Sequence, residues 1–231
     1  GTFALGLRSF VNEARMLARF DHPSLVKVYR FWEDNGTAYM VMPYYKGRTL
    51  RKVRAGMVIA PGEGACRKVL DALLSALEVL HKEGVFHRDI APDNILIGDD
   101  GVPVLLDFGA ARRVIEGGNQ KALTSIMKPH FAPLEQYADQ SAMRQGPWTD
   151  LYALGCVVYE MLSGKPPFTG ANFAQIWDQH LHATPRGLRE QGIECPEWLE
   201  HLVMELLEKE PHKRPFNARA VQGYLRDHLE D

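Results

Sequence analysis

The stretch Val85–Gly109, VFHRDIAPDNILIGDDGVPVLLDFG, constrains the fold of this chain more than any other part of the sequence. Two short apolar runs flank a turn rich in glycine and aspartate, and a polar segment lies at each outer end. This pattern predicts a β-hairpin that returns the second polar segment to the first. Asp89, Asn94 and Asp107 would then lie close together at one end of the hairpin. Their oxygens suit Mg²⁺, and one carboxylate remains to orient a hydroxyl nucleophile.

Composition narrows the class of protein. The chain has 231 residues and a net charge of −2, which gives no electrostatic reason to expect nucleic acid binding. No apolar run approaches the roughly 20 residues that span a bilayer, so we expect no membrane segment. Cys66, Cys156 and Cys195 are odd in number and far apart, which favours a reducing, cytoplasmic location. His180 and His182 form an HxH pair, for which a surface position is favoured over a metal site.

The first part of the chain combines one helix with two strands. Apolar residues at spacings of three and four predict a helix over Leu7–Phe20. Ser24–Trp32 and Thr37–Met42 are rich in strand-forming residues, and the Asn-Gly pair between them predicts a hairpin. Pro43–Gly47 interrupts the strand pattern, so we expect a linker there.

The remainder of the chain is mainly helical outside the opening hairpin. Helical periodicity predicts a short helix from Leu50 and longer helices over 61–81, 149–163, 171–182, 197–208 and 217–229. The helix over 149–163 is apolar on all sides, which predicts that it is buried in a large core. Because strands come first and helices follow, we expect an α+β fold whose two parts join at 43–47.

The two polar segments of the opening stretch form a known combination. The spacing H-R-D-x-x-x-x-N at 87–94, followed by D-F-G at 107–109, resembles the catalytic and metal-binding loops of protein kinases. The segments PHFAPLEQY and GPWTDLYALGCVVYEMLSGKPPF most resemble bacterial serine/threonine kinases. The resemblance implies a bilobal fold with a partial small β-rich lobe and a complete, mainly helical large lobe. Residues 1–42 would be a remnant of the small lobe (an αC-like helix and two strands), 43–47 the hinge and 48–231 the large lobe.

The resemblance also implies roles for individual residues. Asp89 would orient the hydroxyl of a protein substrate and accept its proton, and Asn94 and Asp107 would hold Mg²⁺ on ATP. Glu13, in RSFVNEARML, matches the helix glutamate that pairs with a strand lysine in this family.

The segment YMVMPYY resembles the last small-lobe strand and the hinge that faces the nucleotide. Met42 would stand at the gatekeeper position, and Leu96 would lie under the purine. The carbonyl of Pro43 and the amide of Tyr45 would face adenine. Proline at this position keeps its carbonyl acceptor, because only its N–H is missing.

The irregular stretch after Gly109 resembles an activation segment, in which Thr124 and Ser125 are the nearest candidates for phosphorylation. Glu135 would be a buried carboxylate paired with Arg214, since a buried charge needs such a partner. Asp150 resembles the aspartate that braces the backbone of the HRD motif from the buried helix.

Two departures from the family pattern stand out. Ala91 occupies the place where these kinases usually carry a lysine that neutralises the γ-phosphate. We expect Lys128 to replace that lysine across the site; the alternative is that Lys128 is a solvated loop residue. The first lysine in the chain is Lys27, and no G-x-G-x-x-G precedes Glu13. The chain is therefore expected to be a truncated kinase domain, or one whose small-lobe start is missing from this sequence, and to be inactive alone.

Three functions fit these observations. The leading one is a kinase that phosphorylates Ser/Thr hydroxyls of proteins with ATP and Mg²⁺. The alternative is a pseudokinase that binds or scaffolds, which Ala91 and the missing lysine favour and Asp89, Asn94 and Asp107 oppose. A third, a small-molecule kinase of related fold, is disfavoured by Glu135 and Arg214.

Overall fold

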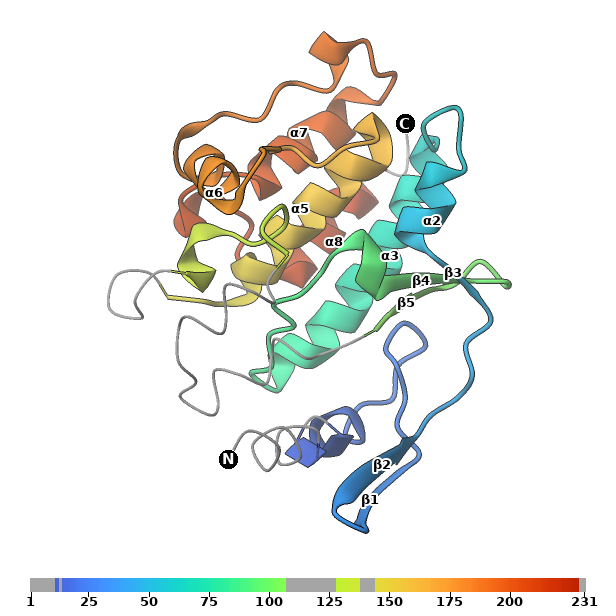
Figure 1. Ribbon diagram of the computed structural model, residues 1–231. Coiled ribbons are helices and arrows are strands. Elements are labelled where there is room, and N and C mark those ends of the chain that lie inside the picture. Colours follow the sequence, from blue (N-terminus) through green and yellow to red (C-terminus); the bar gives the residue numbers. More distant parts are fainter. Residues whose placement is uncertain (1–10, 13, 107–127, 138–143, 229–231) are drawn as a thin grey trace.

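The computed structural model describes residues 11, 12, 14–106, 128–137 and 144–228, with their arrangement shown in Figure 1. Its strands are β1 (Arg30–Asp34), β2 (Thr37–Val41), β3 (Gly47–Thr49), β4 (Ile95–Gly98) and β5 (Pro103–Leu105). Its helices are α2 (Leu50–Ala55), α3 (Glu63–Lys82), α5 (Pro147–Ser163), α6 (Phe173–His182), α7 (Glu197–Leu206) and α8 (Ala218–Asp227). Short 3₁₀ turns are η1 (Pro92–Asn94), η2 (Leu134–Gln136), η3 (Arg189–Gln191) and η4 (Pro211–Lys213). None of the described helices is long and apolar enough to cross a membrane.

Strands β1 and β2 form the predicted antiparallel hairpin. Asn35 and Gly36 both have positive φ values, 50° and 71°, as a type I′ turn requires, and this turn matches the natural twist of the strands. Trp32 and Tyr39 are paired across the hairpin, and their rings stack with centroids 5.3 Å apart. The Asn-Gly pair therefore sets the register of this hairpin.

The strand predicted over Ser24–Trp32 is wrong in its first half, because β1 begins only at Arg30. Residues 24–26 instead contact the other sheet. The Leu105 amide donates to the Ser24 carbonyl (2.8 Å), and the Val26 amide donates to the Leu105 carbonyl (3.2 Å). Apolar, β-branched composition predicts extended backbone but does not tell which partner the backbone pairs with.

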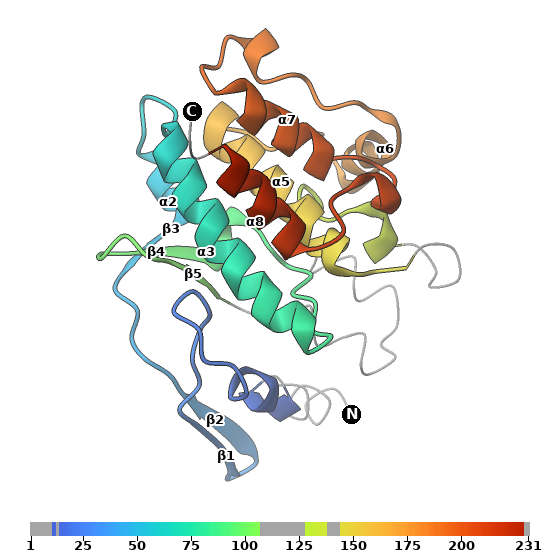
Figure 2. The same ribbon diagram turned by 180° about the vertical axis from the view of Figure 1, so that it is seen from behind.

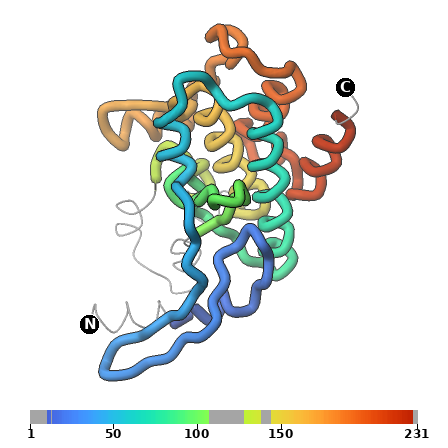
Figure 3. The backbone as a smooth tube through the Cα atoms, turned by 90° about the vertical axis from the view of Figure 1, so that its right-hand side faces the viewer, coloured from blue at the N-terminus to red at the C-terminus, as the bar shows by residue number. Residues whose placement is uncertain are grey.

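The second sheet has the order β3-β4-β5 and contains the hairpin expected from the opening stretch. β3 starts at Gly47, the last residue of the predicted linker, which pairs with Gly98. A Cβ atom on Gly47 would collide with the Ile97 backbone, so this close approach requires glycine. Figure 3 shows the extended segment that leads from β2 to β3 and α2. The hinge at 43–47 stays a prediction.

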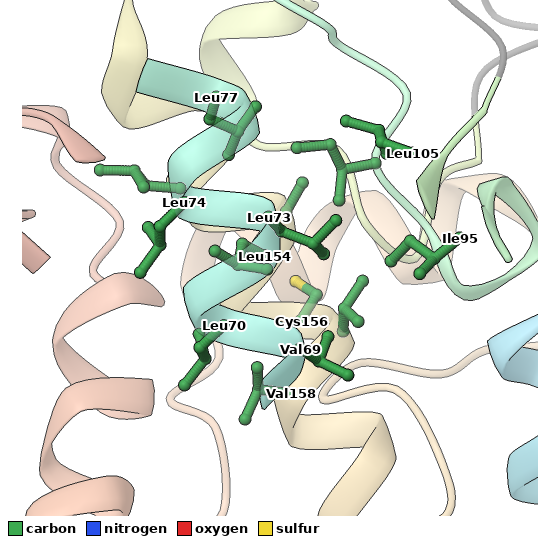
Figure 4. Packing of buried hydrophobic residues seen from close by; sticks show 14 of the residues in the cluster. Val69, Leu70, Leu73, Leu74, Leu77, Ile95, Leu105, Leu154, Cys156 and Val158 are labelled. Atoms are coloured by element: carbon green, nitrogen blue, oxygen red, sulfur yellow. The ribbon is translucent and has the colours of Figure 1, made fainter. Parts of the chain in front are cut away.

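The buried apolar cluster takes side chains from α3, α5, α7, α8 and the β4–β5 hairpin. Figures 1 and 2 show the arrangement of these elements from opposite sides. The predicted all-round burial of α5 is confirmed, since its residues from Thr149 to Leu162 are all buried. Residues 17–28 contribute apolar side chains to the same cluster. The close view in Figure 4 includes these members of the cluster: Val69, Leu70, Leu73, Leu74, Leu77, Ile95, Leu105, Leu154, Cys156 and Val158.

The surface position expected for both histidines of the HxH pair is wrong for His180, which is 2% exposed. Its Nδ1 forms a 2.6 Å hydrogen bond with the Tyr152 hydroxyl. His182 is exposed and pairs with Asp178 at 3.0 Å. His180 lies four residues after the buried Ile176, so helical spacing places both on the inner face of α6. Among the described residues, no group of three His, Cys, Asp or Glu side chains could hold a metal.

The burial of His180 predicts an acid-sensitive contribution to stability. Burial, together with the nearby Lys209 ammonium group, lowers the pKa of His180 to about 3. In the unfolded chain the imidazole binds a proton near pH 6.5. Between these values the unfolded state binds more protons, so His180 makes stability fall as the pH falls from about 6.5 towards 3.

Urea unfolding of the His180→Asn variant between pH 4 and pH 7 measures this contribution. The Oδ1 of asparagine can accept from Tyr152 in place of Nδ1, so the variant should fold and lose stability less steeply on acidification. The matched control is His182→Gln on the exposed face of the same helix, which should keep the full pH dependence. Equal slopes for His180→Asn and the parent protein would contradict the prediction.

Candidate active site

Asp89 and Asn94 meet as the sequence predicted. The Asn94 Nδ2 atom donates to the Asp89 Oδ2 atom (2.7 Å) and to the Asp89 main-chain carbonyl (2.8 Å). Asn94 is 8% exposed and ends the 3₁₀ turn η1, which opens with Pro92. Proline suits this first position because its missing N–H would have no partner in the turn. The turn thus fixes the amide against the carboxylate.

Asp107 and Glu13 lie outside the described residues, but the chain is described up to Leu106. The Leu106 amide donates to the Asn94 carbonyl (2.8 Å), and His87 Nε2 hydrogen-bonds the Leu106 carbonyl (3.1 Å). His87 Nδ1 accepts from the Asp89 amide (3.2 Å), so Nε2 carries the imidazole proton. This fully buried histidine therefore ties the loop of Asp89 to the end of β5.

Asp150, on α5, holds the backbone of this loop in place. Its carboxylate accepts from the amides of His87 (2.9 Å) and Arg88 (2.8 Å) and pairs with His81 Nε2 (2.8 Å). Arg88 has a φ of 63°, a conformation that costs a non-glycine residue about 1–3 kcal/mol. The hydrogen bonds from the two backbone amides to Asp150 offset that cost. The bracing role that the resemblance implied for Asp150 is thereby seen directly.

The charge on Asp150 is maintained despite complete burial. Burial alone would raise the pKa of this carboxyl group, but the hydrogen bond from His81 and the electrostatic interaction with it act against burial. The nearby His87 and the Arg88 amide act in the same direction, so the pKa of Asp150 lies below its usual value. An ionised Asp150 can accept from all three donors at once.

The segment around η2 is attached to the same loop from the other side. Gln136 Nε2 donates to the Arg88 carbonyl (2.9 Å), a contact that no sequence pattern singled out. Arg214 donates to both Glu135 oxygens (2.6 and 3.3 Å), and Thr149 Oγ1 donates to Glu135 Oε1 (3.1 Å). Both side chains of the Glu135–Arg214 pair are fully buried, as the sequence analysis expected. The pair anchors residues 131–137 against α5.

Lys128 and Ala91 both lie within the described residues. Ala91 is fully buried, and the side chain of Lys128 is half-buried. No described residue forms an ion pair with the Lys128 ammonium group. The Lys128 carbonyl accepts from the Phe131 amide (3.0 Å), which starts the tight turn into η2. The replacement of the missing lysine by Lys128 therefore stays a prediction.

The residues expected to contact a nucleotide lie along the segment from β2 to β4. Met42, directly after β2, is 40% exposed, and Pro43 is half-buried. Leu96 is the second residue of β4 and pairs with Thr49 of β3 on one side and with Val104 of β5 on the other. The Tyr45 hydroxyl accepts from the Lys27 amide (2.9 Å), a contact that fixes this segment and that the sequence did not reveal.

Comparison with known proteins agrees with this geometry. Residues 4–224 match the family described as "Protein kinase domain". The chain is 32% identical over 228 residues to serine/threonine-protein kinase PknB of Mycobacterium tuberculosis, covering 94% of this chain and 35% of that protein. It is 30% identical over 221 residues to serine/threonine-protein kinase PrkC of Bacillus subtilis, covering 95% of this chain and 33% of that protein. The chain thus spans about a third of the length of these curated relatives.

Solved structures also show similarity to this chain over most of its length. One, titled "PpkA-294 apo form", is 41% identical with a TM-score of 0.82 and is matched over 97% of this chain and 76% of its own. Another, Rad53 1–466 in complex with AMP-PNP, is 27% identical with a TM-score of 0.74. The match covers 94% of this chain and 54% of the Rad53 chain. The predicted kinase-like fold class and the resemblance to bacterial serine/threonine kinases are confirmed. This chain belongs to the protein kinase family.

Proposed function

We propose that this chain is the catalytic domain of a kinase that transfers the γ-phosphate of ATP to serine and threonine hydroxyls of proteins. The observation that carries the proposal is the hydrogen bond between Asn94 Nδ2 and Asp89 Oδ2, on a loop that Asp150 braces. The printed names of the bacterial relatives support the choice of serine and threonine as acceptors. Phosphoryl transfer needs positioning and charge neutralisation above all, and a rigid loop supplies positioning.

The residues present fit a magnesium–nucleotide complex. Asn94 uses Nδ2 on Asp89, so its Oδ1 remains the oxygen that can ligate a cation, together with Asp107. Asp89 orients the substrate hydroxyl and accepts its proton. Mg²⁺, when bound, neutralises charge on the triphosphate. Glu13 completes the site in our proposal by pairing with a lysine that positions the phosphates; because no lysine precedes Glu13 in these 231 residues, that lysine would come from outside them.

Adenine recognition is assigned to the segment that crosses from β2 to β3. The Pro43 carbonyl and the Tyr45 amide face the base, Met42 limits the depth of the pocket, and Leu96 forms its floor. The Tyr45 hydroxyl holds the Lys27 amide, which supports a fixed position for the Tyr45 backbone. We place the domain in the cytoplasm, where ATP is available and the three free cysteines stay reduced.

Transfer of labelled γ-phosphate by the full-length protein tests this function. With Mg²⁺ and a protein acceptor we expect label on serine or threonine, and Thr124 and Ser125 are candidate sites within the chain. Excess EDTA should abolish transfer, and added Mg²⁺ should restore it. Nucleotide binding without transfer to any acceptor would instead establish a pseudokinase.

The proposed role of Lys128 predicts a loss of turnover in Lys128→Met. If its ammonium group replaces the lysine absent at Ala91, its removal leaves charge on the transferred phosphoryl group uncompensated, and we expect kcat to fall by about 10²-fold or more. The matched control is Lys165→Met, which removes an exposed lysine with no ion pair to a described residue. An unchanged kcat for Lys128→Met would refute this role.

A further inference from the structure

An apolar pocket lies between α2, the first turns of α3 and the turn that joins β4 to β5. Its volume is about 150 Å³. An apolar cavity of about this volume accommodates a benzene ring, so the pocket matches one phenyl side chain. The pocket is lined by Leu50, Val53, Arg54, Met57, Pro61, Ala65, Lys68, Val69, Ile97, Gly101, Pro103 and Met161.

The charged residues that line the pocket are both basic. Arg54 and Lys68 line it, whereas none of the described lining residues carries a carboxylate. Arg54 is held in place, because its Nε donates to the Met161 carbonyl (2.7 Å). Lys68 is exposed and forms no ion pair with a described residue, and its ammonium group lies at Gly101. This rim favours an anionic group beside whatever fills the pocket.

The loop next to the pocket exposes large apolar side chains. Met57, Val58 and Ile59 are 39%, 100% and 81% exposed, and Met57 also lines the pocket. Contiguous exposed apolar residues beside a cavity are a common mark of a protein-binding surface. The loop and the pocket together form one apolar surface with a cationic edge.

This surface is separate from the proposed nucleotide site. Ile97 lines the pocket, and its neighbour Leu96 is the proposed floor under the purine. Successive residues of a strand point to opposite faces of the sheet, so the pocket lies on the other face of β4 from that floor. A ligand in the pocket therefore leaves the nucleotide site accessible.

We propose that this surface docks an extended segment of a partner protein that carries a phenylalanine flanked by acidic residues. The phenyl ring enters the pocket, the acidic residues contact Lys68 and Arg54, and the neighbouring backbone packs on Val58 and Ile59. The small volume and the cationic rim select this occupant over a basic peptide or a long acyl chain. The proposal concerns binding alone, so it stands or fails independently of phosphoryl transfer.

Fluorescence anisotropy with the full-length protein and a labelled peptide Gly-Glu-Glu-Phe-Glu-Glu-Gly tests the proposal. Changing the peptide phenylalanine to alanine, or its glutamates to lysines, should weaken binding by about tenfold or more. The protein variants Ala65→Phe, which fills the pocket, and Lys68→Glu, which reverses the rim charge, should do the same. Binding that survives loss of the phenylalanine or filling of the pocket would overturn the proposal.

Two matched variants control for general effects. Ala220→Phe enlarges an exposed alanine at the same first-turn position of α8 as Ala65 has in α3. Arg186→Glu reverses an exposed charge elsewhere. Both should bind the peptide as the parent does.

Methyl NMR of methionine-labelled protein locates the bound peptide. The methyl signals of Met57 and Met161, which line the pocket, should shift, while that of Met204 on α7 should not. Shifts confined to other methionines would overturn the assignment. Concentration-dependent self-association that disappears in Val58→Glu would show a second copy of the chain as the occupant and would also overturn it.

Discussion

Replacing Asp89 with asparagine is expected to lower kcat by a factor of about 10² to 10⁴, the range that general-base catalysis contributes. The change removes the basic oxygen but keeps an acceptor for Asn94 Nδ2, which now bonds Asp89 Oδ2 at 2.7 Å. The Asp150 brace acts on the amides of His87 and Arg88, so the loop should keep its shape. The defect should therefore appear in kcat, with the KM for ATP nearly unchanged.

Steady-state kinetics of the full-length protein measure this effect. Asp71→Asn is the matched control, because it makes the same chemical change on the exposed face of α3. That variant should keep the parent kcat. Equal stability of both variants in urea would show that a lower kcat in Asp89→Asn does not come from unfolding.

Replacing Arg214 with alanine is expected to destabilise the protein by about 3–5 kcal/mol, the cost of leaving a buried charge without its partner. Glu135 and Arg214 are both fully buried and bond at 2.6 Å. Arg214 also donates to the carbonyls of Glu208 (2.7 Å) and Lys209 (2.9 Å), which lose these donors in the variant. The substitution therefore leaves the buried Glu135 carboxylate without its charged partner, with only the Thr149 hydroxyl still donating to it, and removes one donor from each of two carbonyls.

Urea unfolding compares this variant with Arg219→Ala. Arg219 pairs with Glu78 at 2.8 Å, but its side chain is 69% exposed. An exposed pair of this kind contributes about 0–1 kcal/mol, so the control variant should stay close to the parent. A similar, small loss of stability in both variants would contradict the anchoring role of the buried pair.

Local patterns were sufficient to predict the elements that carry the site. Alternation of apolar runs and turns located the β4–β5 hairpin, the Asn-Gly pair located the β1–β2 turn, and periodicity located α3 and α5. The proximity of Asp89 and Asn94 was expected from the same hairpin pattern, which places the polar segments together at one end of the hairpin. The Glu135–Arg214 pair came from the family resemblance rather than from spacing.

Contacts between segments far apart in the chain could not be predicted from the sequence alone. Residues 24–26 have strand-like composition, but their partner, Leu105, lies some 80 positions later and leaves no local trace. The burial of His180 depends on the tertiary packing of α6 against Tyr152. Gln136 contacts the Arg88 carbonyl from η2, which also carries the buried partner of Arg214, so this contact too depends on tertiary packing.

We propose above all that Asp89 acts chemically on the phosphate acceptor. The most direct test of this claim is the single-turnover rate of phosphate transfer in the full-length protein with Mg-ATP already bound, because this rate excludes binding and product release. We predict that Asp89→Asn lowers the rate by about 10²-fold or more and that Asp71→Asn leaves it unchanged. Equal single-turnover rates for the Asp89→Asn variant and the parent protein would contradict the claim.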